Sequence, residues 1–203
     1  VNLNFDAHVK GAELEATWEP VPGLRFNFAG GYENTSVAKG SKAIDLMDRT
    51  AGHEGWMVVK PFITQSSNCI VPTYVIAAIV QEPHNATFLD LPGACVDSYV
   101  YHGDPVHIPP PGYPGYDYRT APNNGEGFFK DLGGNELPNA PPFTVSAGAQ
   151  YSMPLTTDWA GTLRGDFYWQ DQSWGRIFND DPYDRIHGYK NLNLALIFTN
   201  QGG

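Results

Sequence analysis

Apolar and polar residues alternate along five stretches of this chain, and the longest of them spans residues 143–153. Every second residue there is apolar or aromatic: Phe143, Val145, Ala147, Ala149, Tyr151 and Met153. The residues between them are small or polar: Thr144, Ser146, Gly148, Gln150 and Ser152. Because successive side chains of a β-strand point to opposite faces, a period of two predicts a strand with one apolar and one polar face.

The same alternation predicts four further strands, so the expected fold class is all-β. The five expected strands cover residues 11–18, 24–33, 143–153, 162–170 and 189–198. Between the first two, Pro20 and Pro22 lack backbone donors and Gly23 tolerates a positive φ, which predicts a hairpin with a short turn. We expect the five strands to pair in chain order as one antiparallel up-and-down meander.

The length of these strands favours a membrane β-barrel. Strands of soluble proteins typically have about five or six residues, whereas a tilted transmembrane strand needs about nine to eleven. In a barrel the apolar side meets lipid, the polar side meets a wet lumen, and aromatic residues near the strand ends form interfacial girdles. The expected architecture is a partial segment of a transmembrane β-barrel. The alternative is a soluble antiparallel sandwich with one solvated face, which alternates in the same way.

The connections between the expected strands differ greatly in length. Residues 20–23 and 154–161 form short connections, whereas residues 34–138 and 171–187 form longer ones. Short and long connections alternate, so both long ones leave the sheet on the same side, as in outer-membrane barrels with their short periplasmic turns and longer outer loops. We therefore expect residues 34–138 to form one very long extracellular loop, with a small helix near residues 43–51 and a short strand near residues 74–80.

Composition narrows the classes of function. The 203 residues have a net charge of −10, which argues against a nucleic-acid partner, because phosphate binding requires clustered Lys and Arg. No apolar run approaches the eighteen or so residues that a membrane-spanning helix needs. The sequence shows no Ser-His-Asp arrangement and no P-loop, and the oxygen-rich run 179–184 lacks the spacing of an EF-hand loop. We expect no catalytic, cofactor-binding or metal-ligating residues and no enzymatic activity.

Three stretches of the chain carry a resemblance to a known family. Residues 11–18 and 20–24 have a Gly-x-Glu-Leu-Glu strand, a turn and a returning strand. Residues 137–144 have the pattern Leu-x-Asn-Ala-Pro-x-Phe at the entry into a later strand, and residues 163–170 have an Arg-x-Asp strand that is followed by Gly-Tyr-x-x-Leu-Asn at 188–193. In this order and spacing, the stretches resemble TonB-dependent outer-membrane receptors across nearly the whole chain apart from residues 34–138.

The resemblance implies a fold, a function and a cellular location. Members of that family have a plug domain inside a barrel of many strands, so this chain would be a part of the barrel, with the plug and the C-terminal strands missing from it. The implied function is uptake of a bulky scarce nutrient, such as an iron–siderophore complex or an oligosaccharide, across the bacterial outer membrane. The implied partners are outer-membrane lipid and TonB, the latter through the missing plug domain. The alternatives are a passive porin-like barrel and a secreted carbohydrate-binding β-sandwich.

Both cysteines of the chain, Cys69 and Cys95, lie in the long loop. The resemblance implies an exported protein with this loop outside the cell, where oxidation is permitted, so we expect the two cysteines to form a disulfide. Two free thiols are the alternative.

The resemblance also suggests roles for two sets of side chains. Four charged residues on the polar faces of the expected strands should face the lumen: Arg25, Glu33, Arg164 and Asp166. Aromatic residues of the long loop could stack on a bulky ligand, and those expected to do so are Tyr99, Tyr101, Tyr113, Tyr116 and Tyr118. The alternative for the aromatic set is that it packs the loop against itself.

Overall fold

The computed structural model describes residues 4–60, 68–81, 95, 99–101, 104–106, 116 and 120–200. The chain forms two compact units. Unit 1 comprises Val1–Ser41 and Leu132–Gly203, and unit 2 comprises Lys42–Asp131. Within the described residues, no helix has the length and apolar character needed to cross a membrane.

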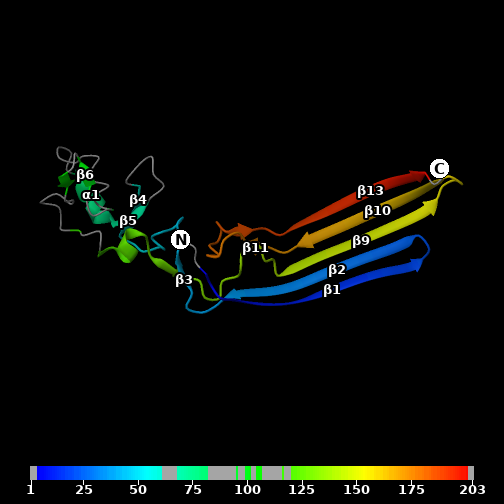
Figure 1. Ribbon diagram of the computed structural model, residues 1–203, viewed down its shortest axis with the longest axis horizontal. Coiled ribbons are helices and arrows are strands. Elements are labelled where there is room, and N and C mark those ends of the chain that lie inside the picture. Colours follow the sequence, from blue (N-terminus) through cyan, green and yellow to red (C-terminus); the bar gives the residue numbers. More distant parts are fainter. Residues whose placement is uncertain are drawn as a thin grey trace. The chain divides into compact units, whose positions relative to one another are not determined.

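Unit 1 is built on one antiparallel sheet of five strands (Figure 1). The strands are β1 (Ala7–Val21), β2 (Leu24–Val37), β9 (Phe143–Pro154), β10 (Trp159–Gln170) and β13 (Tyr189–Asn200), and they lie side by side in this order. All four pairings between neighbours are antiparallel. The expected meander is therefore confirmed, including the pairing of β2 with β9 across more than a hundred residues of intervening chain.

Each strand is longer than the alternating pattern predicts. β1 and β2 have 15 and 14 residues, and β9, β10 and β13 have 12 each. The added residues continue the backbone ladder at positions where polar side chains occupy the face that is otherwise apolar, such as Lys10 opposite Asn34 and His8 opposite Ser36. The apolar pattern stops at these positions, so periodicity alone underestimates the strand ends.

The connections at one end of the sheet are short. Pro22 and Gly23 alone join β1 to β2, and Gly23 has the positive φ of 84° that such a tight turn requires. Residues 155–158 join β9 to β10, and the Thr156 hydroxyl there accepts a hydrogen bond from the Trp159 N–H (3.1 Å). The long connections, 38–142 and 171–188, both leave the opposite end, which we call the loop end.

At the loop end, unit 1 continues as a hydrogen-bonded rim that includes the short pair β11 (Ser173–Trp174) and β12 (Arg185–Ile186). The Leu137 N–H donates to the Thr35 hydroxyl (2.9 Å), which ties the return segment to the end of β2. The oxygen-rich run 179–184 belongs to this rim. Its buried Asp184 carboxylate accepts a hydrogen bond from Arg176 (2.5 Å), and Asp181 pairs with Arg185 (3.0 Å). These carboxylates are thus neutralised by arginines.

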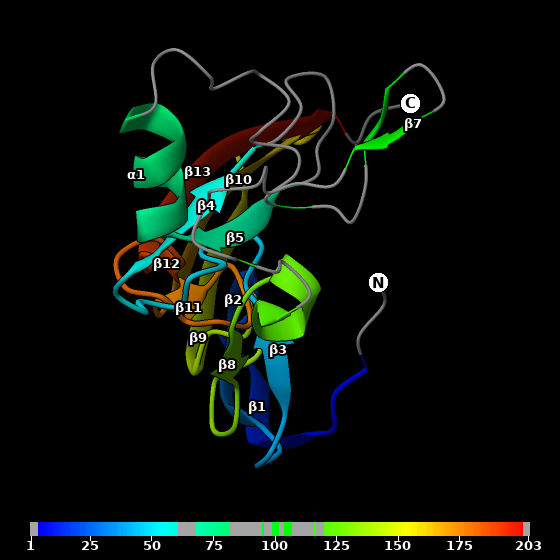
Figure 2. The same ribbon diagram turned by 90° about the vertical axis from the view of Figure 1, so that its left-hand side faces the viewer.

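Unit 2 holds three described strand pairs and a short helix. β3 (Lys42–Ile44) pairs with β8 (Phe129–Asp131), and β4 (Trp56–Val59) pairs with β5 (Cys69–Pro72). Helix α1 (Thr73–Gln81) follows β5 directly and contacts it (Figure 2). The remaining elements are the hairpin of β6 (Tyr99–Tyr101) with β7 (Asp104–Val106) and the 3₁₀-helix η2 (Pro122–Gly125).

Two sequence predictions for unit 2 are wrong. Residues 74–80 were expected to form a strand and instead lie in α1, because an unbroken apolar run has no periodicity that separates helix from strand and Ala77–Ala78 favour the helix. Residues 43–51 were expected to form a helix and instead form part of β3 and a series of turns. The Asp45 carboxylate accepts a hydrogen bond from the Met47 N–H (2.9 Å), a local bond that competes with helix formation.

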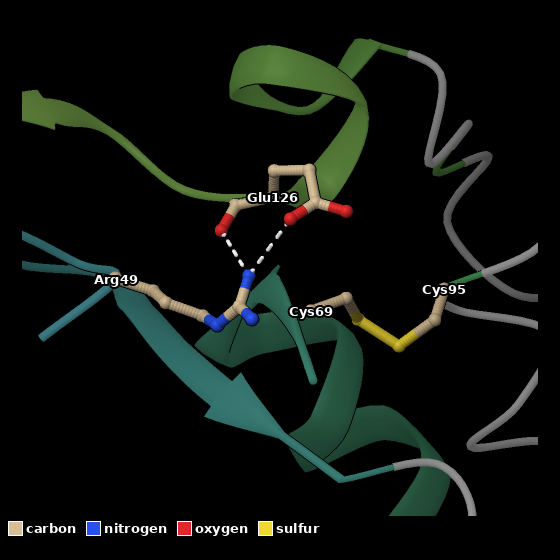
Figure 3. The surroundings of a disulfide bond; sticks show 4 residues. All are labelled: Arg49, Cys69, Cys95 and Glu126. Carbon is tan, nitrogen blue, oxygen red and sulfur yellow. Dashed lines mark hydrogen bonds and ion pairs between the residues drawn. A yellow bond between two sulfur atoms is a disulfide. The ribbon is translucent and has the colours of Figure 1, made fainter. Parts of the chain in front are cut away.

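A small apolar core and a disulfide stabilise unit 2. The core consists of the buried residues Val59, Cys69, Val71, Val75, Tyr116 and Ala121. Cys69 forms the expected disulfide with Cys95, with the two Cα atoms 5.7 Å apart (Figure 3). In the same region Arg49, which is almost fully buried, donates hydrogen bonds to the backbone carbonyl (2.6 Å) and the carboxylate (3.1 Å) of Glu126.

One cation neutralises two carboxylates beside β3 and β8. The Lys130 ammonium lies 2.9 Å from the Asp48 carboxylate and 3.6 Å from that of Asp45, which is fully buried. The hydrogen bond from Lys130 holds the pKa of Asp48 below its ordinary value. Because burial of an unpaired charge is costly, Lys130 is what allows Asp45 to remain inside this unit.

The disulfide should control the order of unit 2 and leave the sheet of unit 1 intact. Removing a cross-link across a sequence separation of 26 residues should destabilise unit 2 by about 3.5 kcal/mol in the chain-entropy model. We expect no thiol labelling before reduction and labelling of two thiols after it. Limited proteolysis after reduction should cut faster within 42–131, with cleavage in the five strands unchanged. Labelling of two thiols in unreduced protein would contradict the disulfide.

Candidate functional site

The register of the sheet places the apolar positions of all five strands on one side. Directly opposed residues of an antiparallel pair point to the same face. One such row crosses the sheet from β1 to β13 through Ala16, Phe28, Ala147, Phe167 and Leu192. We call this side the apolar face: the even-numbered residues 8–18 of β1, the even-numbered residues of β2 and β13, and the odd-numbered residues of β9 and β10. The remaining positions form the polar face.

The apolar face is more exposed than the apolar face of a soluble sheet, and on β9 it is also more exposed than the polar face. Large side chains of the apolar face stand open, with Leu194 74%, Leu14 63% and Leu196 63% exposed. On β9, five of the six apolar-face residues are exposed, whereas all five from Thr144 to Ser152 on the polar face are half-buried. Within the described residues of unit 1, no second layer of strands or helices covers the apolar face.

The polar face contains an open groove of about 600 Å³. It crosses all five strands, and its polar lining residues include Glu15, Asn27, Ser146, Arg164, Asp166 and Asn193. The Arg164 guanidinium donates two hydrogen bonds to the Asp166 carboxylate, from Nε to Oδ2 (2.7 Å) and from a terminal nitrogen to Oδ1 (2.9 Å). This fork geometry is specific to Arg with a carboxylate, and it fixes the orientation of both side chains.

Gly148 creates part of the space in this groove. A Cβ atom at this position would lie 3.0 Å from the Asp166 Oδ1 atom and 3.5 Å from the Asn27 Nδ2 atom. Gly148 is directly opposite both residues in the sheet, Asn27 on β2 and Asp166 on β10. Because Gly148 has no side chain, the space between the Asn27 amide and the Asp166 carboxylate in this row stays open.

All four charged residues predicted to face a lumen lie on the polar face. Arg164 shares a row with Arg25 through Gln150, so two arginines flank one amide. Arg25 also pairs with Glu19 (3.5 Å), in a contact exposed to solvent. Glu33 does not join them: it lines a second hollow toward the loop end, together with Asn139 and Thr144. The structure thus brings Arg164 and Asp166 together and keeps Glu33 apart.

The loop aromatics do not form a described site. Tyr116 is 6% exposed and packs in the core of unit 2. Tyr99 and Tyr101 lie in β6, where the structure describes the backbone, while Tyr113 and Tyr118 lie outside the described residues. Tyr116 follows a Pro/Gly-rich run with no periodicity, so nothing in the sequence indicates its burial.

The groove also contains residues that sequence reasoning does not single out. The alternation places Asn27, Ser146 and Asn193 on the polar, lumen-facing side of their strands but does not show that they meet in one groove, and Gly148 appeared only as a small residue in the alternation. The missing information is the register, because alternation gives the face of a residue and not its neighbours on the adjoining strands. With the register known, the row that joins Asn27, Gly148, Asp166 and Asn193 follows at once.

The groove is a hydrogen-bonding surface. It offers amide, hydroxyl, guanidinium and carboxylate groups that are suited to water and to polar ligands. Across the part of the chain that the structure describes, no three His, Cys, Asp or Glu side chains come together as a metal site would require. Comparison with models of protein families, with curated proteins and with solved structures found no match to this chain.

Substitution of Gly148 by Leu should narrow the groove. The new side chain would occupy the space between Asn27 and Asp166, so a cysteine introduced at Asn27 should react severalfold more slowly with a water-soluble maleimide in the Gly148→Leu background. The matched control is Gly165→Leu, which adds the same side chain on the apolar face, where its Cβ would lie 3.2 Å from a movable Leu194 methyl group. Equal rates in both backgrounds would show that Gly148 does not shape the groove.

Proposed function

We propose that this chain forms part of the transmembrane β-barrel of an outer-membrane receptor that takes up a bulky scarce nutrient with energy supplied through TonB. The observation that carries the proposal is the exposure of the apolar face, whose large side chains stand open on all five strands although the polar face of β9 is half-buried. In the proposed setting the apolar face meets lipid and the groove of the polar face lines the lumen.

The exposed apolar face calls for an apolar surrounding. Leaving a large aliphatic or aromatic side chain in water costs about 1.5–3 kcal/mol relative to burial. Soluble monomers rarely expose contiguous apolar patches larger than a few hundred Å², and here the patch extends over all five strands. The secreted sandwich would need a second layer on this face, whereas a bilayer supplies the apolar contact directly.

The dimensions of the apolar face fit a bilayer. On β9 it runs from Phe143 to Met153, ten residue steps, or about 34 Å at about 3.4 Å per residue. A strand tilted by about 40° converts this length to about 26 Å, and the apolar band of outer-membrane barrels is about 25 Å tall. The apolar stretch of β9 is therefore long enough to cross the hydrocarbon once.

The loop-end boundary of the apolar face supports such a tilt. On β1 the apolar face begins at Ala12, which lies in the row of Phe143. On β13 it begins at Leu192, which lies in the row of Ala147. From β1 to β13 the start of the apolar face therefore shifts by four residues along the strands, which is about 14 Å. The two strands are four strand spacings apart across the sheet, which is about 19 Å. This slope is about 35°, which matches the 35–45° tilt of strands in membrane barrels.

Two further features favour a receptor of the TonB-dependent class. Both long connections lie at the loop end and both short turns lie at the other, as in outer-membrane barrels. The stretches 11–24, 137–144, 163–170 and 188–193, which resemble that family, fall on the strands of this sheet and the segment leading into β9. On this proposal the plug domain and its TonB contact come from other parts of the polypeptide. The nutrient would be an iron–siderophore complex or an oligosaccharide.

Single cysteines can decide which face meets lipid. In the full-length protein, reconstituted into bilayers, cysteines at Ala147 and Leu194 should react with a reagent confined to the hydrocarbon. Their neighbours on the polar face, Ser146 and Asn193, should react with a water-soluble reagent instead, and they serve as matched controls from the same strands. If Ala147 and Leu194 are inaccessible to both reagents, their face is a protein core, and the sandwich replaces the barrel.

Dependence on TonB separates a receptor from a passive porin. Uptake of candidate iron–siderophore complexes and oligosaccharides would be measured in cells that produce the full-length protein, with and without TonB. A receptor should lose accumulation against a gradient when TonB is absent, because nothing then supplies energy to the plug. Uptake that continues at the same rate without TonB, and that saturates only at the external concentration, would identify a passive pore.

A further inference from the structure

The two faces of the sheet differ in the sign of their charged side chains and in whether these side chains form ion pairs. The polar face carries both signs, and each of its arginines has an acidic partner: Arg25 pairs with Glu19 and Arg164 with Asp166. Among the apolar-face positions of the five strands, no Asp or Glu occurs. The charged residues there are Lys10 on β1 and Lys190 on β13, with His8 two residues beyond Lys10.

The two lysines occupy equivalent places at the edge of the apolar face. Lys10 is the next apolar-face residue beyond Ala12, and Lys190 is the next one beyond Leu192. They lie in different rows of the sheet, but the sloping boundary passes through both positions, so in a tilted barrel they stand at the same depth. Both are exposed, and neither has a carboxylate partner among the described residues. The carboxylate of Asp171, just beyond β10, does not pair with either lysine: it accepts a hydrogen bond from the Gln172 N–H (2.8 Å).

The opposite end of the apolar face is different. Toward the short turns, it closes with Trp18, Phe26, Tyr151, Trp159 and Phe198, and no strand residue there on this face is charged. Aromatic rings of this kind suit an interface between hydrocarbon and headgroups of either charge. Two lysines without a carboxylate partner therefore stand at one edge only, in a chain with a net charge of −10, and their charge is complementary to an anion at that edge.

From this placement we propose that Lys10 and Lys190 bind the phosphate groups of anionic lipids in the leaflet at the loop end. The inference rests on the proposed function, because it takes the apolar face to be in contact with lipid. Each lysine lays its aliphatic stem along the apolar face and extends its ammonium to the headgroup layer. The two residues lie four strand spacings (about 19 Å) apart across the sheet and four residues (about 14 Å) apart along it, so each binds its own lipid. Anionic lipid thereby sets the depth and the direction of insertion.

Quenching by brominated lipid tests this proposal on the full-length protein. Trp18, Trp159 and Trp169 lie on the apolar face and report contact with lipid. The protein would be reconstituted into phosphatidylcholine vesicles with increasing brominated phosphatidylglycerol, and separately with brominated phosphatidylcholine, to obtain the relative affinity for the anionic lipid. We expect a clear preference for phosphatidylglycerol in the wild type and a loss of about fivefold for each lysine removed, in K10Q, K190Q and the double variant. The matched control is K39Q, which removes a lysine in the turn after β2 and should keep the wild-type preference.

The outcomes separate the lipid site from the membrane proposal. If brominated phosphatidylcholine quenches all variants equally and the double variant keeps the wild-type preference for phosphatidylglycerol, the lysines do not bind lipid phosphate, although the sheet is in the membrane. If neither lipid quenches tryptophan, the proposed function fails as well. Inorganic phosphate should not alter the preference at matched ionic strength. Loss of the preference with phosphate alone would identify a site for free anions and overturn the lipid assignment.

Discussion

The cross-strand register of the five-stranded sheet is the constraint on which the other features of unit 1 depend. A slip of one residue between two strands would turn every side chain of one of them to the other face. The observed pairings keep the apolar positions of all five strands in common rows and give the polar groove its composition. Turn geometry fixes part of this register, since a connection of two residues at Pro22 and Gly23 leaves little freedom in how β1 meets β2.

The two units are stabilised in different ways. Unit 2 is stabilised by an apolar core around Val71 and Val75, a disulfide, and a neighbouring lysine that neutralises the buried Asp45 carboxylate. Unit 1 has no comparable interior within its described residues, because its sheet is a single layer with large apolar side chains on the open side. Backbone hydrogen bonds hold its strands together, while the free energy of its apolar face depends on what surrounds it.

Much of this fold follows from the sequence because alternation is a local signal. The five strands, their order and the face of each residue were predictable from a period of two, and Arg25, Glu33, Arg164 and Asp166 fall on the predicted face. The groove was not predictable, because it depends on which residues of β2, β9, β10 and β13 share a row. Unit 2 was largely unpredictable, since the apolar run of α1 has no periodicity and the turns after β3 depend on hydrogen bonds of the Asp45 side chain.

The pairing of β3 with β8 has a consequence for how the sheet can assemble. β2 and β9 are separated by about 105 residues, and the entropic cost of closing a flexible loop rises with the logarithm of its length. Once Lys42 pairs with Asp131, the ends of the long insertion are already together, and about fifteen residues remain between the two strands. This shortening lowers the closure cost by about 1.7 kcal/mol, or about 18-fold in the probability of encounter between β2 and β9. If the insertion folds first, the strands of the sheet can therefore pair in chain order, with β2 and β9 meeting almost as readily as strands that are neighbours in sequence.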